Sequence, residues 1–99
     1  MSVYFIHIGD VKDSELLAEY TDGARPVLRD HPHELVVVDT EAQTLEGEPP
    51  GSRVVILKFE SEQACRDFYD SPGYQAVIGK RLEAVEGFDV LAKGYEPPT

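Results

Sequence analysis

Three short segments of this chain are apolar at nearly every position. Residues 3–8 are apolar except for His7, residues 35–38 read Leu-Val-Val-Val, and residues 54–57 read Val-Val-Ile-Leu. A strand with one wet face alternates apolar and polar residues, whereas a strand that is apolar throughout is covered on both faces. The three segments therefore predict strands of a sheet that is packed on both sides.

A segment with helical spacing follows the first of these strands. Asp13 or Ser14 can cap a helix there. Its apolar stripe, at spacings of three and four, consists of Leu16, Leu17, Tyr20, Ala24, Val27 and Leu28. Pro26 removes a backbone donor and disfavours helical geometry in the residue before it, so we expect a kink or break near Arg25.

Two further helices are predicted in succession after the third strand, which spans residues 53–59. Ser61 caps the first, which ends at Asp70. Ser71 with Pro72 at the first helical position starts the second, and Gly87 is expected to stop it. The inner face of the first comprises Ala64, Cys65, Phe68 and Tyr69, and the stripe of the second comprises Tyr74, Val77, Ile78, Leu82 and Val85. Residues 88–92 then read as a fourth strand.

The order strand, helix, strand, strand, helix, strand predicts an α+β fold of the ferredoxin-like βαββαβ type. Such a domain is a four-stranded antiparallel sheet with its helices on one face. We expect residues 1–96 to form this single domain and residues 97–99 to form a tail. Since 99 residues supply no cover for the second face, we expect a second copy of the chain to cover it in a two-fold homodimer.

The charge balance restricts the partners. Nine Lys and Arg residues against nineteen Asp and Glu residues give a net charge of -10. Such a chain is repelled by phosphate backbones and anionic membranes, so we expect neither nucleic acid nor membrane as a partner. The first residues run directly into a strand without a basic region or cleavage site, which favours a cytoplasmic protein. The single cysteine, Cys65, is expected to be a small buried apolar residue.

The second half of the chain resembles a known family, the domain of unknown function DUF1330 of the dimeric alpha-beta barrel superfamily. The resemblance rests on residues 45–47, on Arg53-Val54-Val55-Ile56 leading to Phe59 and Ser61, and on residues 68–75 with Arg81. Around residues 31–34 this chain has His-Pro-His-Glu where the family usually has a glycine-rich turn. The resemblance implies a homodimer whose two sheets enclose a barrel. Superfamily members include cofactor-independent monooxygenases, lactone isomerases, haem enzymes and proteins without known catalysis, so the fold does not fix the chemistry.

Two residues are the candidate catalytic groups. His7 shares a strand face with Val3 and Phe5, and its imidazole changes charge near neutral pH, which suits general acid or base catalysis. Its alternative role is a hydrogen bond within the core or interface. Arg81 lies seven residues after Tyr74, on the same helix side. Its guanidinium can hold a ligand carboxylate or enolate, or it can pair internally with an acid such as Asp70 or Glu46.

Further residues are candidates for contacting a substrate. Tyr69 and Tyr74 flank the break between two helices, where a phenol can bury its ring and direct its hydroxyl to a cleft. Together with Gln75 and Arg53, which lie in the segments that carry the resemblance, they form the expected substrate-binding set: Tyr69, Tyr74, Gln75 and Arg53. His31 and His33 are too few for a metal site, and we expect neither metal nor other cofactor.

These residues favour a homodimer that binds a small organic molecule and catalyses cofactor-free proton transfer, such as isomerisation or cyclisation. Two alternatives remain open from the sequence. One is a non-catalytic structural or ligand-sensing dimer, in which Arg81 is internally paired. The other is a cofactor-independent monooxygenase.

Overall fold

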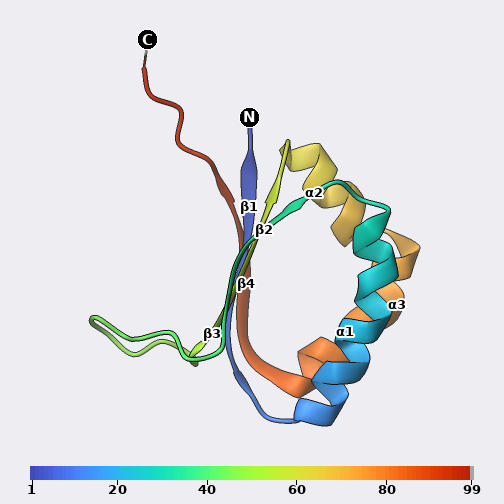
Figure 1. The fold of residues 1–99 in the computed structure, drawn as a ribbon, viewed down its shortest axis with the longest axis vertical. Helices are drawn as coiled ribbons and strands as arrows, with labels where there is room; N and C mark the ends of the chain where they lie inside the picture. The colour runs from blue at the N-terminus through green and yellow to red at the C-terminus, as the bar shows by residue number, and fades with distance from the viewer. Residues whose placement is uncertain (99) are drawn as a thin grey trace.

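The computed structural model describes residues 1–98 as a four-stranded sheet with three helices on one face (Figure 1). Thr99, the last residue of the predicted tail, lies outside the described residues. The elements in chain order are β1 (Val3–Val11), α1 (Ser14–Arg29), β2 (Glu34–Asp39), β3 (Arg53–Phe59), α2 (Glu62–Tyr69), α3 (Pro72–Ala84) and β4 (Val85–Lys93).

The sheet confirms the predicted ferredoxin-like α+β fold. Its strand order is β2-β3-β1-β4, and every neighbouring pair is antiparallel. The central strand β1 places His7 opposite Val55 of β3 and Asp89 of β4. Side chains alternate across a strand, so these three residues and their neighbours at every second position share the helix-covered face.

All three helices begin at the predicted caps. The side chains of Asp13, Ser61 and Ser71 accept hydrogen bonds from backbone N–H groups at 3.0, 3.0 and 3.2 Å. The predicted break near Arg25 is wrong, because α1 continues through Pro26 to Arg29. Pro26 costs the helix one backbone hydrogen bond, and packing against α3 compensates for that loss.

The junction between α3 and β4 also differs from the prediction. The helix ends at Ala84, so Val85 opens the strand, and Gly87 lies within the strand and does not stop the helix. A Cβ atom at Gly87 would lie 2.1 Å from the carbonyl oxygen of Ile8, which explains the glycine by close backbone approach. Leu82 is not part of the buried stripe, since 64% of its surface is exposed.

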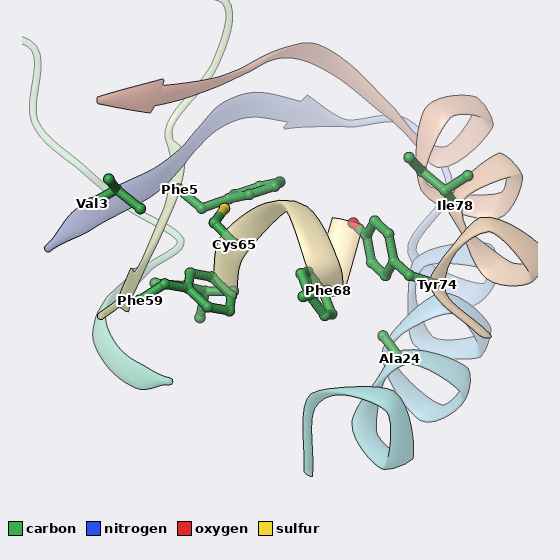
Figure 2. Close-up of a cluster of buried hydrophobic side chains, with 9 residues drawn as sticks. Val3, Phe5, Ala24, Phe59, Cys65, Phe68, Tyr74 and Ile78 are labelled. Carbon is green, nitrogen blue, oxygen red and sulfur yellow. The ribbon is translucent and has the colours of Figure 1, made fainter. Parts of the chain in front are cut away.

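An aromatic core fills the space between the sheet and α2 (Figure 2). The ring of Phe68 stacks on Phe59, with centroids 5.6 Å apart, and lies 4.4 Å from the ring of Tyr74. Cys65 is buried beside them as predicted, and burial raises the pKa of its thiol. These residues hold α2 against β1 and β3.

Helix α1 packs on α3 rather than closely on the sheet. Two glycines allow this contact: a Cβ atom at Gly23 would lie 2.7 Å from Val77, and one at Gly73 would lie 3.0 Å from Val27. With α1 held on α3, the sheet beneath it is left partly uncovered.

The opposite face of the sheet is apolar and lies away from the helices (Figure 1). Phe88 and Val90 on this face are 50% and 47% exposed. The loop between β2 and β3 projects from the same side, with Leu45 96% exposed. No element among residues 1–98 packs over the centre of this face.

Candidate functional site

A cavity of about 410 Å³ lies between the inner face of the sheet and helices α1 and α3. Its floor comes from β1, β2, β3 and β4, and its roof comes from α1 and from Tyr74 and Arg81 of α3. The volume falls in the range of small-molecule sites, which are about 300–1,000 Å³. Of the six candidate residues from the sequence, four line this cavity: His7, Arg53, Tyr74 and Arg81.

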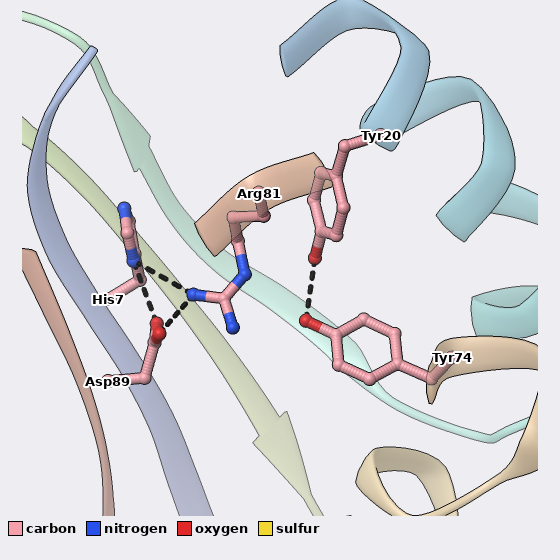
Figure 3. A network of polar contacts seen from close by, with 5 residues as sticks. All are labelled: His7, Tyr20, Tyr74, Arg81 and Asp89. Carbon is pink, nitrogen blue, oxygen red and sulfur yellow. Dashed lines mark hydrogen bonds and ion pairs between the residues drawn. The ribbon is translucent and has the colours of Figure 1, made fainter. Parts of the chain in front are cut away.

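A buried polar network occupies one end of the cavity (Figure 3). His7 Nδ1 donates to Asp89 Oδ1 at 2.7 Å, and Arg81 Nη1 donates to Asp89 Oδ2. His7 and Arg81 are only 4% and 5% exposed. The internal partner of Arg81 is therefore Asp89, not Asp70 or Glu46.

The polar network keeps Asp89 ionised. Burial alone would raise the pKa of Asp89, but the hydrogen bonds from His7 and Arg81 and the charge of Arg81 hold that pKa below its ordinary value. Burial by itself would lower the pKa of Arg81. The phenolic oxygen of Tyr74 and the carboxylate of Asp89 outweigh that effect, so the pKa of Arg81 is raised. Both groups are charged at neutral pH.

Asp89 also sets the tautomer of His7. A carboxylate can only accept hydrogen bonds, so Nδ1 of His7 carries a proton. In the neutral imidazole the lone pair is then on Nε2, which is buried and has no hydrogen-bond partner among the described residues. Arg81 Nη1 approaches His7 Nδ1 to 3.5 Å, but both atoms are donors. Nε2 is therefore the nitrogen of His7 that can accept a proton.

Two tyrosine hydroxyls form a second polar pair in the cavity (Figure 3). Tyr20 and Tyr74 lie 2.7 Å apart at their oxygen atoms, and burial raises the pKa of both phenols, so both keep their protons at neutral pH. One proton serves the bond between them, which leaves the other hydroxyl proton available to a ligand oxygen. The guanidinium carbon of Arg81 lies 5.8 Å from the ring centroid of Tyr20.

Two sequence candidates lie elsewhere. Tyr69 borders a smaller cavity of about 250 Å³ with Cys65, Arg66 and Leu91. Gln75 donates a hydrogen bond of 2.7 Å from Nε2 to the carbonyl oxygen of Tyr69, so it ties the end of α2 to the start of α3. Neither residue lines the larger cavity.

Sequence reasoning missed Asp89 and Tyr20. Asp89 is the only charged residue among residues 88–92, which are otherwise apolar, and such an acid is a detectable signal of a paired charge. Tyr20 fits the apolar stripe of α1, and nothing in its spacing predicts a hydrogen bond to a residue 54 positions later.

His31 and His33 form a local turn interaction. His33 Nδ1 lies 2.8 Å from the carbonyl oxygen of His31 and donates to it. Within residues 1–98, no three His, Cys, Asp or Glu side chains are grouped closely enough to hold a metal ion. Across the same residues, the helices are too short or too polar to cross a membrane.

The family model of the domain of unknown function DUF1330 matches residues 2–95. The chain belongs to the DUF1330 family. A comparison with curated proteins finds no match.

Solved structures similar to this DUF1330 domain share its fold. A protein of unknown function from Rhodopseudomonas palustris superposes with a TM-score of 0.77 at 17% identity, over 97% of this chain and 84% of that chain. SnoaB, a cofactor-independent oxygenase from Streptomyces nogalater, gives a TM-score of 0.67 at 15% identity, over 97% and 95%. HapK from Hahella chejuensis gives 0.60 at 13% identity, over 100% and 97%. At these identities the similarity concerns the fold alone.

Proposed function

We propose that this chain binds a small organic molecule in the cavity under α1 and catalyses cofactor-free proton transfer, as in an isomerase or cyclase. His7 is the general base, and the free hydroxyl proton of the Tyr20 and Tyr74 pair stabilises the oxygen that gains negative charge. The observation that carries this proposal is the bond from His7 Nδ1 to Asp89, with Nε2 left unpartnered in a residue that lines the cavity.

The chemistry follows from the charges. When Nε2 takes a proton from a carbon acid, the imidazole becomes positive next to the carboxylate of Asp89, which stabilises that charge. Arg81 occupies the second oxygen of Asp89 and keeps it ionised. The electrons released from carbon move to the substrate oxygen. The available hydroxyl proton of the tyrosine pair and the guanidinium groups of Arg53 and Arg81 stabilise the negative charge on that oxygen.

A general-base probe tests the role of His7. In 5-nitrobenzisoxazole, removal of the ring C–H proton breaks the N–O bond and gives a coloured phenolate, so absorbance reports proton transfer directly. We expect the wild-type chain to accelerate this reaction and the His7→Gln variant to lose about 100-fold of that rate, since positioned bases contribute about 10²–10⁴-fold.

His33→Gln is the matched control for that experiment. His33 lines the same cavity, but it is bonded to the turn carbonyl of His31 and is exposed. The control should keep the wild-type rate. Equal rates in the wild type and in folded His7→Gln would remove His7 as the base.

We further propose that the chain is a homodimer formed through the outer face of the sheet. This face presents apolar residues of adjacent strands, among them Ile6, Ile56, Phe88 and Val90. A second copy of the same face would bury them, and the exposed Leu45 on the projecting loop adds apolar surface on that side.

Analytical ultracentrifugation tests the dimer. We expect the wild type to sediment as a dimer and Val90→Asp to shift it to monomer, because a charge would face the apolar surface of the partner. Glu83→Gln, an exposed change on α3 on the opposite side of the sheet, is the control and should leave the dimer intact. A wild-type monomer at micromolar concentration would refute this arrangement.

Two other functions have specific support. SnoaB is described as a cofactor-independent oxygenase and shares this fold, so oxygen consumption with an electron-rich aromatic substrate would favour oxygenation. The pairing of Arg81 with Asp89 also fits a non-catalytic, structural or ligand-sensing dimer. Absence of turnover in every assay would favour that role.

A further inference from the structure

Charge is distributed very unevenly between the cavity and the rest of the molecule. The chain has a net charge of -10, yet four of its five arginines line this cavity: Arg25, Arg29, Arg53 and Arg81. Of its nineteen acidic residues, only Asp89 lines it. The cavity is therefore a cationic pocket inside an acidic protein.

The single acid does not neutralise this pocket. Both oxygens of Asp89 are already engaged, one by His7 and one by Arg81. Arg53 is partly buried and has no ion-pair partner within 4.0 Å among residues 1–98. Burial and repulsion from Arg81 both lower the pKa of Arg53.

A second observation points to a missing acceptor. Nε of Arg81 is a buried N–H donor without a hydrogen-bond partner in the described chain. Buried donors are almost always paired in folded proteins, and an unpaired one is unfavourable. Together with the free proton of the Tyr20 and Tyr74 pair, it presents two unpaired donors to the end of the cavity where His7 Nε2 lies.

We propose that the cavity takes an organic anion, a carboxylate or enolate attached to an apolar ring or chain, with its charged oxygens held by Arg53 and Arg81. This inference rests on the proposed function and names its class of substrate. The apolar part of the ligand contacts the hydrophobic lining, which includes Leu28, Leu35, Val38, Val55 and Leu57.

The register of the sheet places the anion near the proposed base. Arg53 lies opposite Gly9 of β1, and Gly9 is two residues from His7 on the same face. A Cβ atom at Gly9 would lie 3.0 Å from His7 Nε2, so the unpartnered nitrogen is next to the residue that faces Arg53. Arg53 and His7 therefore border the same part of the cavity.

The entrance of the cavity also favours an organic anion with an apolar part. Leu35 and Val38 are each 58% exposed on β2, which offers an apolar entrance. Across from them, α1 contributes Arg29 and also Arg25, which pairs with the exposed Asp22 at 3.5 Å. Exposed cations at an entrance raise the local concentration of anions and accelerate their association.

A matched pair of probes tests the charge requirement. 2-Naphthoate and 2-naphthamide have nearly the same shape, and only the first is an anion. We expect isothermal titration calorimetry to show naphthoate binding at least about tenfold more tightly than naphthamide, since charge-assisted hydrogen bonds exceed neutral ones. The preference should decrease with added salt, because the entrance charges are exposed.

Arg53→Met removes the unpaired charge and keeps an apolar side chain of similar length. This variant should lose the preference for naphthoate and retain naphthamide binding. Arg66→Met is the control, because Arg66 is the one arginine that does not line this cavity. It should keep the wild-type preference.

Three results would overturn the proposal: equal binding of both probes, an unchanged preference in Arg53→Met, or no detectable binding of naphthoate. The measurement involves no turnover. Loss of anion preference therefore leaves proton transfer by His7 intact, and loss of the His7-dependent reaction leaves the anion preference intact.

Discussion

The inner face of the sheet carries two regions of opposite character. Under α2 lies a buried aromatic core around Phe59 and Phe68, each of which is 1% exposed. Under α1 lies the cavity with the His7, Asp89 and Arg81 network. Both regions belong to one layer between the helices and the strands.

The difference arises from how each helix is held. Cys65 and Phe68 pack α2 directly on the sheet. Gly23 and Gly73 instead allow α1 to pack closely on α3, which leaves space between α1 and the sheet. Tyr74 belongs to both regions, because its ring packs on Phe68 and its hydroxyl bonds to Tyr20. The aromatic core therefore positions Tyr74, whose hydroxyl group lies in the cavity.

The largest expected effect is in the aromatic core. Phe68→Ala removes a fully buried ring, and we expect the free energy of unfolding to fall by about 3–5 kcal/mol. Urea denaturation measures this change. A loss below about 1 kcal/mol would mean that the core collapses around the vacancy and is not tightly packed.

A somewhat smaller effect is expected in the polar network. Asp89→Asn leaves the Arg81 charge buried without its counter-charge, and we expect a loss of about 2–4 kcal/mol. The side chain of Asp89 is 18% exposed, which places the loss below that of a fully buried pair. The same denaturation experiment measures it, and an unchanged stability would show that the network does not support the fold.

The network also predicts a pH dependence. Because the folded-state pKa of Asp89 is lowered, its contribution is complete above the unfolded value of about 4 and is lost as the pH falls through the lower folded value. The wild type should therefore lose more stability than Asp89→Asn between pH 5 and pH 2, approximately the range of this titration. Parallel pH profiles of the two proteins would contradict the pairing.

The tyrosine pair is expected to contribute about 1 kcal/mol. Tyr20→Phe removes one hydroxyl and leaves that of Tyr74 without its partner. Tyr69→Phe is the control, since no hydrogen bond is found for its hydroxyl in the described residues. Equal stability losses in the two variants, measured by thermal unfolding, would show that the pair adds nothing specific.

The smallest effect is expected on the outer side of α3. Leu82→Gln should change the free energy of unfolding by no more than about 0.5 kcal/mol, because Leu82 is 64% exposed. A large loss would place Leu82 in a contact that this single chain does not contain. Ultracentrifugation of the variant would then test whether that contact is with a second copy.

Local patterns predicted much of the fold. The start of each helix could be predicted from its capping residue, which is Asp13, Ser61 or Ser71. These side chains accept hydrogen bonds from the first free N–H groups of the helices. That His7 shares a strand face with Val3 and Phe5 follows from the two-residue period of a strand, whereas only the structure shows that this face is the helix-covered one. The continuation of α1 through Pro26 could not be predicted from the local sequence, because the packing of α1 on α3 outweighed the helix-breaking preference of proline.

The sequence by itself determined the order of the strands and helices, the N-terminal caps, and most of the residues that share a face. Only the tertiary structure decided that Asp89 pairs with His7 and Arg81, that Tyr20 meets Tyr74, and that Arg53 joins them in one cavity. The physical reason is distance along the chain. Periodicity and capping act over a few residues, whereas His7 and Asp89 are 82 positions apart and meet through the register of β1 with β4.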